Sequence, residues 1–137
     1  MTQLRRNPDD DIIITRGRGL FETWYFQDDD GAAISLANTD VVIQVRAGVN
    51  NTPSPSGTLI LEMKRISNTS SKITINNAAG TVVPSFTAAD ADLFTAGGDY
   101  WWDGYTQVSG EQPCGFPSDG PARWIVHEKI SNVGGGS

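Results

Sequence analysis

Hydrophobic and polar residues alternate along several short stretches of the chain, and a period of two is typical of β-strands. The alternation is clearest over 20–27, 41–46 and 58–64. The residues that share one face are Leu20, Glu22, Trp24 and Phe26 in the first stretch, Val41, Ile43 and Val45 in the second, and Leu59, Leu61 and Met63 in the third. We expect the valine-rich face of the second stretch to point inward, while Gln44 and Arg46 face water.

Turn-forming residues separate these stretches and divide the chain into about eight strands. Further strands are predicted over 12–15, 73–75, 81–86, 99–108 and 122–130, the first of them at a sheet edge. Turn formers also fill the loops 48–57 and 109–120. One helical turn is predicted over 87–94, because Thr87 can cap it and Asp90 stands at the third helical position, as in a capping box.

Together these elements predict an all-β fold, a single antiparallel β-sandwich with one short helical turn and extended termini. The sandwich domain is expected over 12–130, with an N-terminal arm over 1–11 and a Gly-rich tail over 131–137. The pattern does not determine which strands pair. A chain of 137 residues buries roughly two-thirds of its unfolded surface, so neither a metal nor a disulfide is needed for stability.

The composition of the chain excludes several kinds of partner and site. The net charge is -6, and three aspartates (9–11) lie within the densest group of arginines, so a nucleic-acid partner is not expected. Cys114 is the single cysteine, which excludes an intrachain disulfide and a Cys-rich zinc site and suits a reducing cytoplasm. No apolar run approaches the ~18 residues of a membrane helix. The polar start lacks the apolar core of a signal peptide.

Several motifs follow one another in a definite order. In the first half these are Gly17, the aromatic strand 20–27, the acidic turn Asp28-Asp29-Asp30-Gly31, the segment 34–36 and the valine strand that ends at Arg46. In the second half they are the strand 72–75, the Thr-Ala-Ala-Asp turn 87–90, Gly98-Asp99-Tyr100 with Asp103 close behind, and the hydrophobic strand 124–128. This order resembles the small β-sandwich virion modules of phages that are like the N-terminal domain of the baseplate upper protein.

The resemblance spans roughly residues 12 to 130 and implies a phage virion role at the tail or baseplate. Such a role works through protein contacts and without catalysis. Two features depart from the family pattern. The loop 112–121 is longer than the family hairpin, and Trp101-Trp102 replaces a lighter aliphatic pair. Both departures bear on which surface docks.

Catalytic chemistry is not expected. A nucleophilic site would pair Cys114 or a serine with His127, yet Cys114 lies in a Pro/Gly-rich loop and no Gly-x-Ser-x-Gly elbow is present. A carboxylate pair would be Asp99 and Asp103, four residues apart on one strand face. One small sandwich offers little depth for such a site. We therefore expect Asp99 to begin the strand, Asp103 to bond to backbone or to an arginine, and no cofactor.

Two binding chemistries stay open. The acidic turn 28–31 could hold calcium, but Ala32 and Thr39 occupy positions where an EF-hand loop needs ligands, so a solvated turn is expected. A sugar-stacking platform could be built from the aromatic residues Trp24, Tyr25, Tyr100, Trp101, Trp102, Tyr105 and Trp124. Because neighbours in a strand point to opposite faces, Trp101 and Trp102 cannot both be core, and one of them is expected to face solvent or a partner.

These arguments predict a non-catalytic phage structural protein, a docking module of the tail or baseplate that is made in the host cytoplasm and resides in the virion. Its expected partners are other virion proteins and copies of itself, bound through the arms by strand addition or charge pairing. The predicted interface residues are Arg5, Arg6, Asp9, Asp10, Arg18, Trp101, Tyr105 and Phe116. The alternatives are a capsid decoration (cement) protein and a carbohydrate-binding module for host recognition. No membrane partner is expected.

Overall fold

The computed structural model describes residues 3–5, 11–20, 22–28, 30–117 and 120–128. The predicted tail, 131–137, and most of the predicted arm lie outside these residues, and so do Arg6, Asp9 and Asp10. The described residues form eleven strands and one short helix. None of their helices is long and apolar enough to cross a bilayer.

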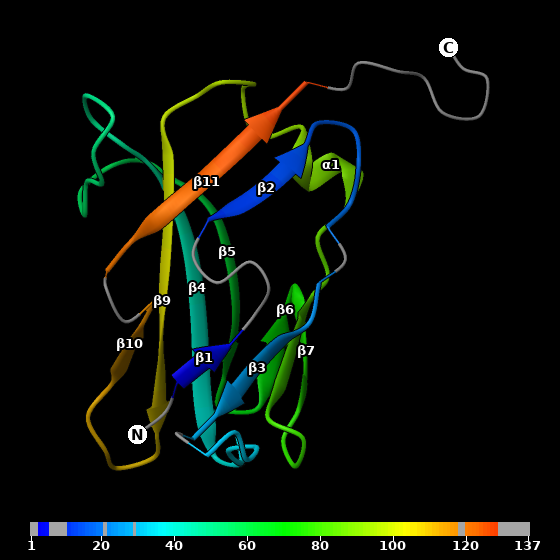
Figure 1. Ribbon diagram of the computed structural model, residues 1–137, viewed down its shortest axis with the longest axis vertical. Coiled ribbons are helices and arrows are strands. Elements are labelled where there is room, and N and C mark those ends of the chain that lie inside the picture. The colour runs from blue at the N-terminus through cyan, green and yellow to red at the C-terminus, as the bar shows by residue number, and fades with distance from the viewer. Residues whose placement is uncertain (1–2, 6–10, 21, 29, 118–119, 129–137) are drawn as a thin grey trace, which may run out of the picture.

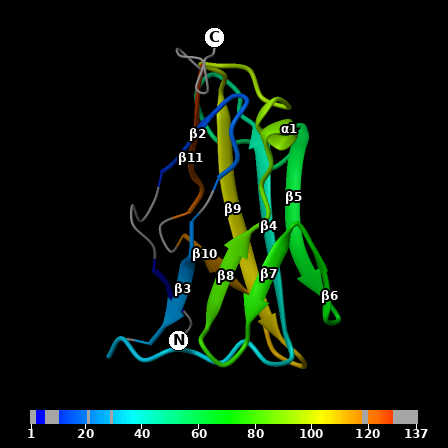
Figure 2. The same ribbon diagram turned by 90° about the vertical axis from the view of Figure 1, so that its right-hand side faces the viewer.

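The strands form two sheets that pack face to face. The smaller sheet contains, in spatial order, β1 (Gln3–Arg5), β3 (Trp24–Gln27), β8 (Thr81–Pro84) and β7 (Ile73–Asn76). The larger sheet contains β2 (Ile12–Thr15), β11 (Ala122–His127), β9 (Tyr100–Val108), β4 (Thr39–Ala47), β5 (Leu59–Ile66) and β6 (Thr69–Ser71), and β10 (Cys114–Phe116) also pairs with β9. Figure 1 shows β3 and β7 to the right of β4 and β9, and Figure 2 shows the layers from the side. The predicted all-β sandwich is confirmed.

The space between the sheets is filled by the inward faces of alternating strands. Val41, Ile43 and Val45 are fully buried, as their alternation predicted. Trp24 of β3 and Trp102 of β9 meet across the core as a stacked pair, with ring centroids 5.5 Å apart. Residues of both sheets therefore share one hydrophobic cluster.

A bulge in the pairing of β4 with β5 changes the face of one predicted core residue. Val45 pairs with Leu61, but the next residue, Arg46, pairs with Leu59, so β5 contains one extra residue at this point. Leu61 and Met63 are buried as their shared face predicted, whereas Leu59 is 40% exposed. The prediction for Leu59 is wrong because a single extra residue turns the chain beyond it to the opposite face.

The strands depart from the prediction in number, direction and extent. There are eleven strands among the described residues and not about eight, since the three-residue strands β1, β6 and β10 lack a clear alternation. The sandwich is not wholly antiparallel, because β2 runs parallel to β11. The predicted strand 20–27 is regular only from Trp24, while Leu20 forms an isolated bridge with Phe86.

The predicted helical turn is present as α1 (Ala88–Ala91), which is shorter than 87–94. Asp90 accepts a hydrogen bond from the Thr87 amide at 3.0 Å, and the Thr87 hydroxyl accepts one from the Asp90 amide at 3.2 Å, which completes the capping box. The Lys72 ammonium donates to Asp90 at 2.8 Å. Burial tends to raise the pKa of Asp90, but the hydrogen bonds from Lys72 and Thr87 outweigh it and lower the pKa.

A buried arginine connects β5 to the loops at one end of the sandwich. Arg65 is only 6% exposed. Its guanidinium donates to the carbonyl oxygens of Leu36 and Thr39 at 2.5 and 2.8 Å and to the Asn77 side chain at 2.6 Å. Burial lowers the pKa of Arg65, and the nearby carboxylate of Asp40 opposes this shift.

Candidate functional site

The predicted interface residues lie on different parts of the molecule. Arg5 ends β1, which pairs with β3 of the same chain, so this part of the predicted arm is a strand of the smaller sheet. Arg18 is exposed in the turn after β2. Trp101 and Tyr105 share the outer face of β9, the face turned away from the smaller sheet. The described members of the set therefore do not form one surface.

Phe116 belongs to the core, so the prediction that it is an exposed anchor is wrong. It is 5% exposed, and its ring packs edge-on against Phe26 with centroids 5.4 Å apart and lies 6.1 Å from the ring of Trp102. The reason is that β10 pairs with β9 and turns Phe116 inward opposite Gly104. Because Gly104 has no side chain, the phenyl ring can lie directly over the backbone of β9.

Trp101 and Trp102 divide between surface and core, as the alternation predicted. Trp102 is 1% exposed, whereas Trp101 is only partly buried. The Trp101 indole nitrogen donates to Asp99 at 2.9 Å, and the same carboxylate accepts from the backbone amide of Asn51 at 2.7 Å. The guanidinium of Arg123 lies 4.7 Å from the Trp101 ring centroid, a cation–π distance. Two charged neighbours therefore hold the indole in one orientation.

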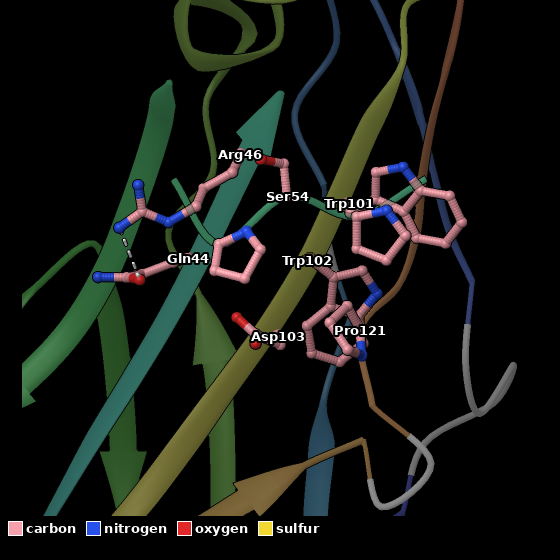
Figure 3. Close-up of a pocket in the computed structure, with 9 residues that line it drawn as sticks. Gln44, Arg46, Ser54, Trp101, Trp102, Asp103 and Pro121 are labelled. Carbon is pink, nitrogen blue, oxygen red and sulfur yellow. Dashed lines mark hydrogen bonds between the residues drawn. The ribbon is translucent and has the colours of Figure 1, made fainter. Parts of the chain in front are cut away.

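A pocket of about 200 Å³ opens beside Trp101 on the outer face of the larger sheet (Figure 3). We call it the Trp101 pocket. Its apolar lining includes Trp101, Pro53, Pro55 and Pro121. Its polar lining consists of Gln44, Arg46, Ser54 and Asp103. Trp102, whose side chain is otherwise buried in the core, also contributes to the lining, so the pocket joins two tryptophans and three prolines to a small group of hydrogen-bonding side chains.

A chain of hydrogen bonds across β4 and β5 holds one wall of the pocket. Arg46 donates to the carbonyl oxygen of Gly57 at 2.9 Å and to the Gln44 side-chain oxygen at 3.3 Å (Figure 3). The Gln44 amide donates to Glu62 at 2.6 Å, and Lys64 lies 2.9 Å from the same carboxylate. The hydrogen bonds from Gln44 and Lys64 lower the pKa of Glu62. Arg46 is therefore positioned before any ligand arrives.

Asp103 is the carboxylate of the pocket. Its side chain is exposed, and no described residue donates a hydrogen bond to it. Desolvation by the surrounding pocket walls raises its pKa, and the positive charge of Arg46 opposes this shift. The predicted bond from Asp103 to backbone or an arginine is thus only a longer-range attraction to Arg46. The carboxylate oxygens stay available as acceptors.

The other candidate groups are dispersed. Cys114 lies partly buried in β10, and His127 is exposed at the end of β11. In the acidic turn, Asp28 accepts hydrogen bonds from the backbone amides of Asp30 and Ala32 at 2.9 and 3.0 Å, so its carboxylate stabilises the turn. Within the described ranges, no three His, Cys, Asp or Glu residues are grouped to hold a metal ion.

A second surface lies at the edge of the larger sheet that ends in β2. Ile13 of β2 is 52% exposed and pairs with Ile125 of β11, which is partly exposed on the same outer face. The Arg16 amide donates to the carbonyl of His127 at 2.9 Å, so by alternation the backbone amide of Ile13 points away from β11. No described strand pairs with that side of β2. We call Ile13, Ile125 and this free backbone the β2 edge.

Trp101 and Trp102 belong to the aromatic residues weighed as a sugar-stacking platform, and Asp103 belongs to the carboxylate pair, whereas the other pocket residues were not predicted as part of a site. The sequence indicated that Gln44 and Arg46 face away from the core and that 48–57 is a loop, and both features hold. The pairing of β4 with β9 places Gln44 opposite Asp103 and Arg46 opposite Trp101. That pairing is what brings the pocket together, and the alternation of a single strand contains no information about it.

Comparisons with known proteins give no family. No protein-family model matches the chain. No curated protein matches it. A solved chain aligns with 92% of this chain over 99% of its own length, at 12% identity and a TM-score of 0.49. It comes from work on the structural basis of T cell specificity and activation by the bacterial superantigen toxic shock syndrome toxin-1. No conclusion about this chain rests on that likeness.

Proposed function

We propose that the chain is a non-catalytic docking domain of a bacteriophage particle, located at the tail or baseplate. The motif order described above supports a virion role, and the β2 edge supports docking. The partners are neighbouring virion proteins and further copies of the chain. The virion, assembled in the host cytoplasm, is the place where the domain acts.

The exposed β2 edge is the observation that carries the docking role. A free strand edge offers unpaired amide and carbonyl groups to another strand, and soluble proteins usually protect such edges with lysine, proline or a covering element. Here an isoleucine that is 52% exposed occupies the middle of the edge strand, next to a second isoleucine on the same face. Strand addition by a partner would satisfy the backbone groups and cover both apolar side chains.

Mass spectrometry of purified particles, with heads and tails separated, tests the virion role. We expect the chain in the tail fraction in a fixed ratio to the other tail proteins. Recovery in the head fraction would instead indicate the alternative, a capsid decoration protein. Absence from both fractions would refute a virion role altogether.

Substitution of Ile13 by lysine tests the β2 edge. Ile13→Lys places a charge on the edge strand, so we expect particles to assemble without the chain or with much less of it. Ile66→Lys is the matched control, because Ile66 is 39% exposed in β5, towards the other side of the same sheet. Circular dichroism and thermal melting of both purified variants establish that they fold. Equal incorporation of both variants would show that the β2 edge is not the docking surface.

A further inference from the structure

The Trp101 pocket has an apolar floor whose shape is fixed in advance. Asp99 anchors the indole nitrogen of Trp101 at 2.9 Å, and Arg123 lies over the ring. Pro53, Pro55 and Pro121 add rigid apolar walls. Because little side-chain freedom remains to be lost on binding, a ligand with an apolar face gains most of the contact energy that this floor offers.

The hydrogen-bonding groups of the pocket offer both acceptors and donors. The Asp103 carboxylate accepts no hydrogen bond from any described residue and has room for two donors. Arg46 has five N–H groups, of which two are used by Gly57 and Gln44, so others remain for a ligand oxygen. The Ser54 hydroxyl also lines the pocket and can act in either sense. A ligand that both donates and accepts hydrogen bonds is therefore complementary to these three side chains.

The charges of the pocket favour a neutral ligand. A cation drawn to Asp103 would also meet the positive charges of Arg46 and of Arg123 on the Trp101 ring. An anion drawn to Arg46 would meet the negative charge of the Asp103 carboxylate. A hydroxyl group avoids both conflicts, because it can donate to Asp103 and accept from Arg46 at once.

The size of the pocket limits the ligand to about one ring. Its volume of about 200 Å³ is below the roughly 300–1,000 Å³ of pockets that enclose drug-sized molecules. From this combination of floor, hydrogen-bonding groups, charge and size, we propose that the Trp101 pocket binds one uncharged saccharide ring. The apolar face of the ring lies against Trp101 and the prolines, and its hydroxyls bond to Asp103 and Arg46.

Saturation-transfer NMR and calorimetry on the full chain test this site. The probes are glucose, galactose, mannose, rhamnose, N-acetylglucosamine and N-acetylgalactosamine, with glucosamine and glucuronate as cationic and anionic counterparts. We expect saturable binding of at least one neutral sugar with a Kd on the order of 1 mM. The charged counterparts should bind at least about tenfold more weakly than the neutral sugar that binds.

Variants assign the binding to the pocket. Trp101→Ala removes the floor and Asp103→Asn removes the charged acceptor, so each should weaken binding by about tenfold or more. Tyr25→Ala is the matched control, because Tyr25 is an aromatic residue that is 44% exposed on the smaller sheet. Asp103→Asn also controls for misfolding, because it changes an exposed side chain without changing its size and should leave the fold intact.

Three results would overturn the proposal. The first is that none of the neutral sugars binds at concentrations up to about 50 mM. The second is that binding is unchanged in both pocket variants, and the third is that glucosamine or glucuronate binds best. The site is independent of the proposed docking role: Ile13→Lys should leave sugar binding intact, and Asp103→Asn should leave incorporation into particles intact. Failure of one proposal is therefore distinguishable from failure of the other.

Discussion

Gly104 lies where the core can tolerate no side chain, so Gly104→Ala should destabilise the fold strongly. A Cβ atom at this position would lie 2.4 Å from the carbonyl oxygen of Val42 and 2.6 and 2.8 Å from two atoms of the Phe116 ring. An unstrained carbon–oxygen contact is about 3.3–3.6 Å. The phenyl ring can rotate or shift, but the Val42 carbonyl is part of the backbone of β4. About 1 Å of separation between β4 and β9 would therefore be required.

Three contributions determine how far Gly104→Ala lowers the free energy of unfolding. Overpacking of this kind typically costs about 1–3 kcal/mol, and we take the upper end because one contact is with backbone. A weakened ladder hydrogen bond adds about 1 kcal/mol. The reduced entropy of the unfolded chain returns about 0.4–1 kcal/mol when alanine replaces glycine. The net loss is about 3 kcal/mol, or about 10 °C in Tm for a domain of this size.

Urea denaturation and thermal melting measure this loss, and Gly115→Ala is the matched control. Gly115 lies in the neighbouring strand β10, where a Cβ atom would meet only the Gly104 carbonyl oxygen at 3.8 Å, an ordinary contact. The control should change stability by less than about 1 kcal/mol. A double-mutant cycle with Phe116→Leu separates the ring contact from the backbone contact. Equal stability of Gly104→Ala and the native chain would refute the account of how Phe116 is buried.

Substitutions at three further positions test other contacts by urea denaturation. Arg65→Met should lower the free energy of unfolding by about 3–5 kcal/mol, because it leaves buried carbonyl groups without their hydrogen-bond donor. Arg65→Lys keeps a donor and should lower it less. Asp90→Asn should cost about 1–2 kcal/mol at neutral pH. Since the pKa of Asp90 is lowered from 3.8, the native chain should lose this contribution as the pH falls through the folded pKa, and the variant should show a weaker acid dependence. The pKa of Asp103 is raised, so its ionisation is harder in the folded state. The native chain should therefore gain stability when acidification protonates Asp103. Asp103→Asn should be slightly more stable than the native chain at neutral pH and should lack this gain in stability at lower pH. The opposite sign for either aspartate would contradict the assigned contacts.

The sequence was sufficient where a local pattern decides the structure. The alternation over 41–46 places Val41, Ile43 and Val45 in the core, because the pleat of a strand sends alternate side chains to opposite faces. The capping box at α1 was visible for a similar reason, since both of its hydrogen bonds join residues three apart. The all-β class follows from the sum of such local signals.

The candidate site shows the limit of that reasoning. Alternation required one of Trp101 and Trp102 to leave the core, and Trp101 does so. The same reasoning could not place Pro53 and Pro121 beside it, because contacts between distant segments depend on how β4, β9 and the loops pack. Nor could it place Phe116 in the core, since the inward turn of β10 depends on its pairing with Gly104.

The sequence by itself determined most of the longer strands, which of their side chains avoid water, and where the helical turn begins, but it missed the three-residue strands β1, β6 and β10. The tertiary structure decided the parallel pairing of β2 with β11, the bulge that exposes Leu59, and the assembly of the Trp101 pocket. The physical reason is the distance along the chain between the residues that interact. Pleat and capping act over a few bonds of chain, whereas pairing, register and pocket shape come from the joint packing of segments far apart in sequence.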